Sequence, residues 1–444
     1  MRSRNSILKN VLVWCAAILL ISSCAKENDS QISNLTQDES NEVLLSWMNL
    51  SFHLTQEAPG YTPPISARAY SYICLGLSEC TIQGQGKRSM MSIINEGQKA
   101  NLPKFSGEID WQLLVNDYMY TICKSFFANS KPAMIQDIEN LYKQNAARLS
   151  ESISNIEVIK RSQNFGAAMA KAIFEFSKTD GQEYAFTNNY PANYRGPIGQ
   201  GVWNATKHVE KKPLQPFWGN VRTYFTENTD LHLTSTPPSF STEKNSVFYS
   251  YALEVINKAR NMNYEEETMV KYWNDEKKGS FTPAGHLMSI LTQILEVEKT
   301  NLNKSAEAYM KLGIALHDVT VAIWKTKYTF NTIGADEYIR TYIDDEFLTL
   351  MESPATPEFS SGQSALASAA AEVLGDIFGH NYSFTDRTYE NSKQFNGVPR
   401  VFKNFQQMAE EASMANLYGG IHYRFSIEEG IKQGIQIGEN INKL

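Results

Sequence analysis

The sequence of 444 residues is short of positive charge, because 41 Lys and Arg residues stand against 48 Asp and Glu, a formal net charge of -7. An acidic chain with no basic run lacks the clustered phosphate contacts that nucleic-acid binding requires, so we expect no nucleic-acid partner. The sequence also lacks low-complexity tracts and repeats with a period of about 20–50 residues, which excludes repeat architectures. Hydrophobic residues make up 42% of the chain, enough for a large core and too many for a disordered protein.

The apolar run at the start of the chain is too short to span a bilayer. Val11–Ile21 holds eleven residues, whereas a transmembrane helix needs about 20. Basic residues before such a run and small residues after it are typical of a secretory signal. The ending LISSC, which closes at Cys24, resembles the lipobox of bacterial lipoproteins. This resemblance implies that residues 1–23 are removed and that Cys24 is lipidated; an ordinary signal peptide cut nearby is the alternative.

Residues 24–41 are polar and predict a flexible tether between the lipid and a folded domain. Ala25 rather than an aspartate follows Cys24, which favours sorting to the outer membrane. We therefore expect a cell-envelope lipoprotein held at the outer membrane by its N-terminal lipid. Which face of that membrane it occupies stays open.

Three cysteines remain after the signal and the proposed lipid site, and their spacing does not fit a zinc site. Because three is an odd number, at least one thiol is free, and packed core cysteines are the simplest interpretation. Disulfide pairing stays open among Cys74, Cys80 and Cys123.

The body of the chain, residues 42–444, predicts a single large all-α domain. Apolar residues recur at three- and four-residue spacing, and no sustained alternation indicates strands. Prolines fall between the helical segments. The long segment from 180 to 238, rich in Gly, Pro and aromatic residues, predicts an extended loop that caps a site or covers the core. The helical segments that we predict are 246–261, 286–298, 305–327, 364–378, 402–415 and 427–441.

Three short motifs in the C-terminal half combine residue types that suit an anion. WKTKY (324–328) ends a long helix, PEFSSGQS (357–364) opens an alanine-rich one, and YGGIHY (418–423) carries a histidine after two glycines. Ser and Gly at a helix start expose unpaired backbone N–H groups beside the positive end of the helix dipole. Each motif alone has a plain structural explanation: an N-cap serine, a packed histidine, a surface lysine.

Together and in this order, the motifs resemble the vanadium-dependent haloperoxidases and their relatives, the type 2 phosphatidic acid phosphatases and bacterial class A acid phosphatases. The family pattern is Lys-x6-Arg-Pro, then Pro-Ser-Gly-His, then Ser-Arg-x5-His. The resemblance extends over about 42–444, with the motifs in about 242–444. It implies a haloperoxidase-like helical bundle, an oxyanion pocket that takes vanadate or a phosphate ester, and, by analogy, a homodimer. Other segments that carry it are PPISARAYSYICLGLSEC (63–80), PLQPFWGNVRTYF (213–225), GSFTPAGH (279–286) and LGIALHDVTVAIWKTKY (312–328).

Four positions keep the family's residues. The resemblance assigns Lys327 to the motif lysine, and Ser361 with Gly362 to the Ser-Gly pair. His422 falls on the histidine that bonds phosphorus or vanadium, which implies a catalytic nucleophile or the vanadate ligand.

Other positions depart from the pattern. Gly334 and Ala335 stand where the family has Arg-Pro, and Asn416 stands where it has the second arginine. Gln363 replaces the acid/base histidine, and an amide cannot exchange a proton near neutral pH. The loss of two guanidinium contacts weakens anion binding by roughly two to four orders of magnitude.

Nearby residues are candidates to replace the lost groups: Arg340 and Arg424 for the arginines, and His286 or His317 for the base. A packing role is the plainer explanation of His286 and His317. Two hypotheses therefore compete. The first is an accessory or binding protein with a degraded pocket; the second is an active haloperoxidase or phosphatase with a retuned pocket that uses His422.

Overall fold

The computed structural model describes residues 39–104, 106–151, 153–203, 212–229, 235–276, 279–390, 392 and 397–444. Within them the fold is all-α, as predicted, with fourteen α-helices and one small sheet. Cys24, the signal segment and nearly all of the tether lie outside the described residues, so their assignment stays a prediction. In the described part of the chain, no helix is both long and apolar enough to cross a membrane.

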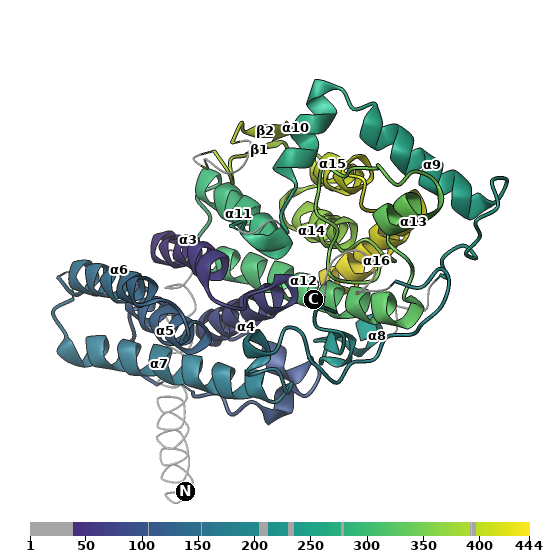
Figure 1. Ribbon diagram of the computed structural model, residues 1–444. Coiled ribbons are helices and arrows are strands. Elements are labelled where there is room, and N and C mark those ends of the chain that lie inside the picture. Colours follow the sequence, from purple (N-terminus) through teal and green to yellow (C-terminus); the bar gives the residue numbers. More distant parts are fainter. Residues whose placement is uncertain are drawn as a thin grey trace, which may run out of the picture.

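The long helix α12 (Leu302–Phe330) runs through the middle of the molecule (Figure 1). Its N-cap Asn301 accepts a hydrogen bond from the Lys304 amide through its side chain. On one side α12 packs against α4 (Pro63–Ile82), and Gly313 allows the close approach, since a Cβ there would lie 3.2 Å from the Ser71 Cα. Most residues of α4 and α12 are buried, so these two helices lie at the centre of the core.

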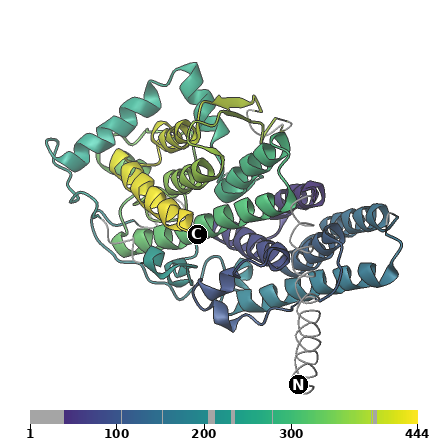
Figure 2. The same cartoon turned by 180° about the vertical axis from the view of Figure 1, so that it is seen from behind.

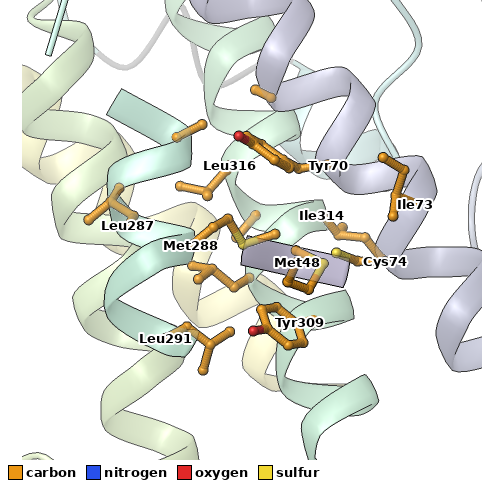
Figure 3. Packing of buried hydrophobic residues seen from close by; sticks show 14 of the residues in the cluster. Met48, Tyr70, Ile73, Cys74, Leu287, Met288, Leu291, Tyr309, Ile314 and Leu316 are labelled. Carbon is orange, nitrogen blue, oxygen red and sulfur yellow. The ribbon is translucent and has the colours of Figure 1, made fainter. Parts of the chain in front are cut away.

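The N-terminal helices form a layer beside α4. They are α3 (Glu42–Glu57), α5 (Trp111–Phe126), α6 (Pro132–Ser150) and α7 (Ile156–Lys178). Figure 3 shows the apolar contacts of the central core, where Met48, Tyr70 and Cys74 meet Met288 and Tyr309. Cys74, Cys80 and Cys123 are all free and buried, as expected of packed core thiols, and burial raises the pKa of Cys123 to about 12.

The C-terminal helices surround the other side of α12 (Figures 1 and 2). Glycines let α16 lie directly on α14: a Cβ at Gly430 would stand 2.4 Å from the Ser361 carbonyl oxygen, and one at Gly434 2.2 Å from that of Ala365. The elements are α8 (Thr226–Thr229), α9 (Val247–Arg260), α10 (Tyr264–Tyr272), α11 (Thr282–Val297), α13 (Ala335–Tyr342), α14 (Gly362–Phe378), α15 (Phe405–Tyr418) and α16 (Arg424–Asn442).

Short elements complete the described residues. Strands β1 (Phe384–Asp386) and β2 (Arg400–Phe402) pair antiparallel, with Phe384 opposite Phe402. The predicted loop from 180 to 238 holds, where it is described, only α8 and short turns. The 3-10 turns are η1 (Gln83–Gln85), η2 (Met90–Ser92), η3 (Gly97–Lys99), η4 (Ala185–Thr187) and η5 (Trp218–Asn220).

Candidate anion pocket at the start of α14

His422 lies in the turn between α15 and α16 and is held by Glu358. Its Nδ1–H donates to Glu358 Oε1 at 2.7 Å, and the Tyr423 amide donates to the same oxygen at 3.0 Å. Burial lowers the pKa of His422, although the hydrogen bond and charge of Glu358 oppose this effect. In the neutral ring with Nδ1 protonated, Nε2 carries the lone pair. Glu358 is a residue of the candidate site that the sequence alone did not single out, although it stands in the PEFSSGQS motif.

Lys327, near the end of α12, contacts the segment before α14 that contains Glu358. Its ammonium donates to the carbonyl oxygens of Pro357 at 2.9 Å and Glu358 at 3.0 Å. The side chain is only 3% exposed, and burial lowers the pKa of Lys327 to about 8 even though the charge of Glu358 raises it. Two of the three ammonium donors are therefore used by the protein itself, which leaves one for a ligand.

Ser361 is the N-cap of α14, and its side-chain hydroxyl is used in capping the helix. Its Oγ accepts a hydrogen bond from the Ser364 amide at 3.4 Å and lies 2.8 Å from the Ser364 Oγ. Gly362 is the first residue of the helix, and a Cβ there would meet only the Ile323 Cγ2, at 3.7 Å. Packing alone therefore does not require glycine at position 362.

The side-chain amides of Gln363 and Asn416 both donate hydrogen bonds to other groups of the protein. Gln363 Nε2 donates to the Trp273 carbonyl at 2.7 Å and to Asp275 Oδ2 at 3.2 Å. Asn416 Nδ2 donates back to the Ala412 carbonyl at 3.1 Å, within α15. The carbonyl of Asn416 also accepts the His422 amide at 3.3 Å, so Asn416 shapes the turn that carries the histidine.

His286 stands between two buried carboxylates. Its Nδ1 lies 2.9 Å from both Asp275 carboxylate oxygens, its Nε2 lies 2.8 Å from Asp386 Oδ2, and its ring stacks on Trp273. Burial works against protonation, but the two aspartates outweigh it and raise the pKa of His286 to about 10. His286 is thus a charged imidazolium with both nitrogens occupied, and it connects to Gln363 through Asp275. Neither aspartate stands in a motif that the sequence alone singles out.

The other replacement candidates pair elsewhere. Arg340 donates to Asp336 on its own helix, and Arg424 Nε donates to Glu254 Oε1 on α9 at 2.7 Å. His317 Nε2 donates to the Arg222 carbonyl at 2.9 Å, and burial lowers the pKa of His317 to about 4.

The structure therefore joins Lys327 and His422 through Glu358, with Asn416 at the turn that carries His422. Ser361 and Gly362 follow Glu358 in the chain, whereas Gln363 bonds to Trp273 and Asp275. Among the described residues, neither guanidinium makes a hydrogen bond or ion pair with Lys327, Glu358 or His422. No group of three or more His, Cys, Asp or Glu side chains in the described ranges has the arrangement of a metal site.

Comparison with known proteins agrees with this architecture. A family model described as the VCPO second helical-bundle domain matches residues 307–444. The crystal structure of a bacterial vanadium-dependent iodoperoxidase aligns with a TM-score of 0.82 and 25% identity, over 92% of this chain and 97% of that one.

More distant structures share the fold. The holo form of a bacterial vanadium-dependent chloroperoxidase aligns with a TM-score of 0.62 and 13% identity, over 86% of this chain and 92% of that one. An apo form aligns with a TM-score of 0.64 and 12% identity, over 87% and 93%. No curated protein sequence shows a significant match to the chain.

Proposed function

The chain belongs to the vanadium haloperoxidase superfamily, and from this premise we propose that it is a cell-envelope binding or accessory protein with little or no catalytic activity. One observation carries the proposal. Among the described residues, Lys327 is the cation that hydrogen-bonds to the segment holding His422, and the two arginines proposed as replacements are paired with Asp336 and Glu254.

The donor set does not fit a tightly held vanadate. An oxyanion of that charge needs several charge-assisted contacts, and two missing arginines at about 1.5–3 kcal/mol each weaken it by roughly two to four orders of magnitude. Lys327 has one donor left. Glu358 Oε2 is buried beside His422 without a hydrogen-bond partner among the described residues, and this acceptor repels an incoming oxyanion.

The candidate site also lacks a side chain that can act as a general acid or base. Gln363 cannot take up or release a proton near neutral pH. His286, which connects to Gln363 through Asp275, is held in its charged form by Asp275 and Asp386. A general acid–base group typically contributes about 10²–10⁴-fold to the rate, so its absence adds to the loss of anion binding.

A second candidate function, an active peroxidase or phosphatase with a retuned pocket, is favoured by the His422–Glu358 pair. A carboxylate on Nδ1 fixes the tautomer and leaves the Nε2 lone pair available, which is the state that a nucleophile or a metal-ligating histidine needs. Vanadate bound there would activate peroxide toward halide.

Activity assays separate the two candidates. The purified protein is incubated with vanadate, peroxide and iodide or bromide, and in parallel with a chromogenic phosphate monoester. We expect turnover no higher than that of His422→Ala, and vanadium NMR that shows no binding in the micromolar range. Turnover that disappears in His422→Ala would establish the active enzyme instead.

Anchoring and assembly are tested independently. We propose that Cys24 carries the lipid, so Cys24→Ser abolishes metabolic labelling with a fatty acid and releases the protein from the outer-membrane fraction. The homodimer proposed by analogy predicts twice the mass of a single mature chain in light scattering of the lipid-free protein.

A further inference from the structure

A hollow lies within the long loop that the sequence predicts to cap a site or cover the core. Its volume is about 510 Å³, within the range of small-molecule sites. The end of α7 and the turn η4 contribute to its lining, together with the start of η5 and the residues before it. None of the residues that line it belongs to the three motifs of the α14 pocket.

The lining of this hollow is fixed by hydrogen bonds to the rest of the fold. Gln215 Nε2 donates to the Ala185 carbonyl at 3.1 Å and to Asn189 Oδ1 at 2.9 Å. The Asn189 side chain donates in turn to the Gly60 carbonyl at 3.0 Å, which ties this loop to the start of α4. The turn η4 is therefore held in place before any ligand binds, and this limits the ordering entropy that binding costs.

Two aromatic side chains with accessible rings line the hollow. Tyr184 is 66% exposed and Phe217 is 44% exposed. The Phe217 ring packs edge-to-face on Tyr194 at 5.9 Å between centroids, and Tyr194 packs in the same way on Tyr328 at 5.4 Å. The Tyr194 hydroxyl also donates to Asn331 Oδ1 at 3.2 Å, so the ring that supports Phe217 is itself fixed. Exposed apolar surface in a concave site with polar surroundings is typical of a ligand-binding surface.

The polar side chains of the hollow are uncharged, apart from one ion pair. Lys178 Nζ lies 3.3 Å from Glu183 Oε1, so the two charges of the lining cancel. The side-chain amides of Gln182, Asn188 and Asn193 make no hydrogen bond to another described residue, and each offers donors and an acceptor. A neutral lining disfavours ions, because an ion would lose hydration there without gaining an opposite charge.

We propose that this hollow binds a neutral carbohydrate of one or two pyranose units. A pyranose has a face of C–H groups and a rim of hydroxyl groups. The C–H face packs on the rings of Tyr184 and Phe217, and the hydroxyls exchange hydrogen bonds with the amides around them. An apolar ligand would leave the amides unpaired, and an anion would meet Glu183 as well as Lys178. This site does not depend on the function proposed for His422.

Calorimetry on the purified protein tests the chemistry with cellobiose, maltose and lactose, together with two partial mimics. Glycerol has hydroxyls without a ring face, and cyclohexanol has a ring with a single hydroxyl. We expect at least one disaccharide to bind with a Kd below about 5 mM, and both mimics to bind at least about tenfold more weakly than it. A Kd above that value for all three disaccharides, or equal affinity for either mimic, overturns the proposal.

Variants of the two aromatic residues locate the binding. Phe217→Ala and Tyr184→Ala should each weaken the disaccharide at least about fivefold, because each removes a ring that supplies apolar contact area. Phe217→Tyr keeps the ring and should bind within about twofold of the native protein. Tyr264→Ala is the matched control, since it removes a tyrosine that is 83% exposed on α10 and lies outside the lining of the hollow.

Thermal unfolding confirms that each variant is folded, and either alanine variant decides the test if the other is not. Unchanged affinity in a folded Phe217→Ala or Tyr184→Ala refutes this site, as does an equal loss in Tyr264→Ala. Because His422 takes no part, a failure here says nothing against the function proposed for the α14 pocket.

Discussion

His422 and Glu358 form a buried hydrogen bond of 2.7 Å that joins the turn before α16 to the segment before α14. This hydrogen bond fixes the orientation of the His422 ring. It does so although this chain has other residues where the haloperoxidase pattern has two arginines and an acid/base histidine. Glu358 also accepts the Tyr423 amide, and its carbonyl accepts Lys327. Glu358 therefore holds both Lys327 and His422, the former through its backbone carbonyl and the latter through its carboxylate.

Glu358→Ala should destabilise the fold by about 2–4 kcal/mol, because it removes two hydrogen bonds to a charged acceptor and leaves the partner donors buried. Glu358→Gln keeps an acceptor oxygen and should cost about 1 kcal/mol. Urea unfolding measures both changes, and the nitrogen chemical shifts of His422 report its tautomer. A Glu358→Ala protein with unchanged stability and an unchanged Nδ1–H tautomer would contradict the positioning role of Glu358.

The charged state of His286 predicts a pH dependence of stability. Its pKa is about 10 in the folded protein and about 6.5 in an unfolded chain, so the folded state binds the proton more tightly. The stabilisation is fully present below about pH 6.5 and is lost as the pH rises through about 10, a change of a few kcal/mol.

The measurement is the difference in free energy of unfolding between the native sequence and His286→Asn, at intervals from pH 6 to about pH 10. We expect the difference to shrink steadily as the pH rises. Groups that titrate in both proteins, such as Lys327, cancel in the difference. A constant difference would show that His286 is neutral in the folded state.

Most of the fold follows from local sequence signals. The predicted segments 305–327 and 364–378 are the interiors of α12 and α14, which begin two or three residues earlier because Asn301 and Ser361 cap them. The strand pair was missed because three-residue strands are too short for an alternation to show. The segment 286–298 likewise extends back to Thr282 in α11.

The candidate site was less predictable because its contacts join distant segments. Asp275 and Asp386 are 11 and 100 residues from His286 in the sequence. The local sequence pattern around His286 therefore does not predict that these carboxylates contact its ring. Proximity in sequence to the motifs did not predict the partners of Arg340 and Arg424, since their guanidinium groups pair with carboxylates on α13 and α9.

The glycines of α16 should be intolerant of any side chain. Gly434→Ala would put a Cβ 2.2 Å from a backbone oxygen of α14, which cannot yield as a flexible side chain can. We expect a loss of about 1–3 kcal/mol in urea unfolding. Gly362→Ala is the matched control, because a Cβ there has ordinary van der Waals room, and its stability should change by no more than about 0.5 kcal/mol. Equal effects of both substitutions would argue against the close α14–α16 packing.

Arg340 and Arg424 should be dispensable for anion binding. Both are partly exposed and paired with carboxylates, so their replacement by alanine should cost at most about 1 kcal/mol of stability. Phosphate affinity, measured by calorimetry in each variant, should stay within about twofold of the native protein. A tenfold loss in either variant would mean that its guanidinium reaches the bound anion, and the retuned-enzyme hypothesis would then gain support.

Restoring the lost groups tests how far the scaffold still supports an oxyanion. Gly334→Arg, Gln363→His and Asn416→Arg together should raise vanadate affinity by about 10²–10⁴-fold in vanadium NMR titrations, since two guanidinium groups return. The same triple variant with His422→Ala is the control and should bind more weakly. Asp336 limits the gain: its Oδ1 would lie 3.0 Å from the new Cβ at 334 and can pair with the added arginine. Adding Asp336→Asn should therefore raise the affinity further. A folded triple variant with no gain would mean that the pocket has lost its shape as well as its charge.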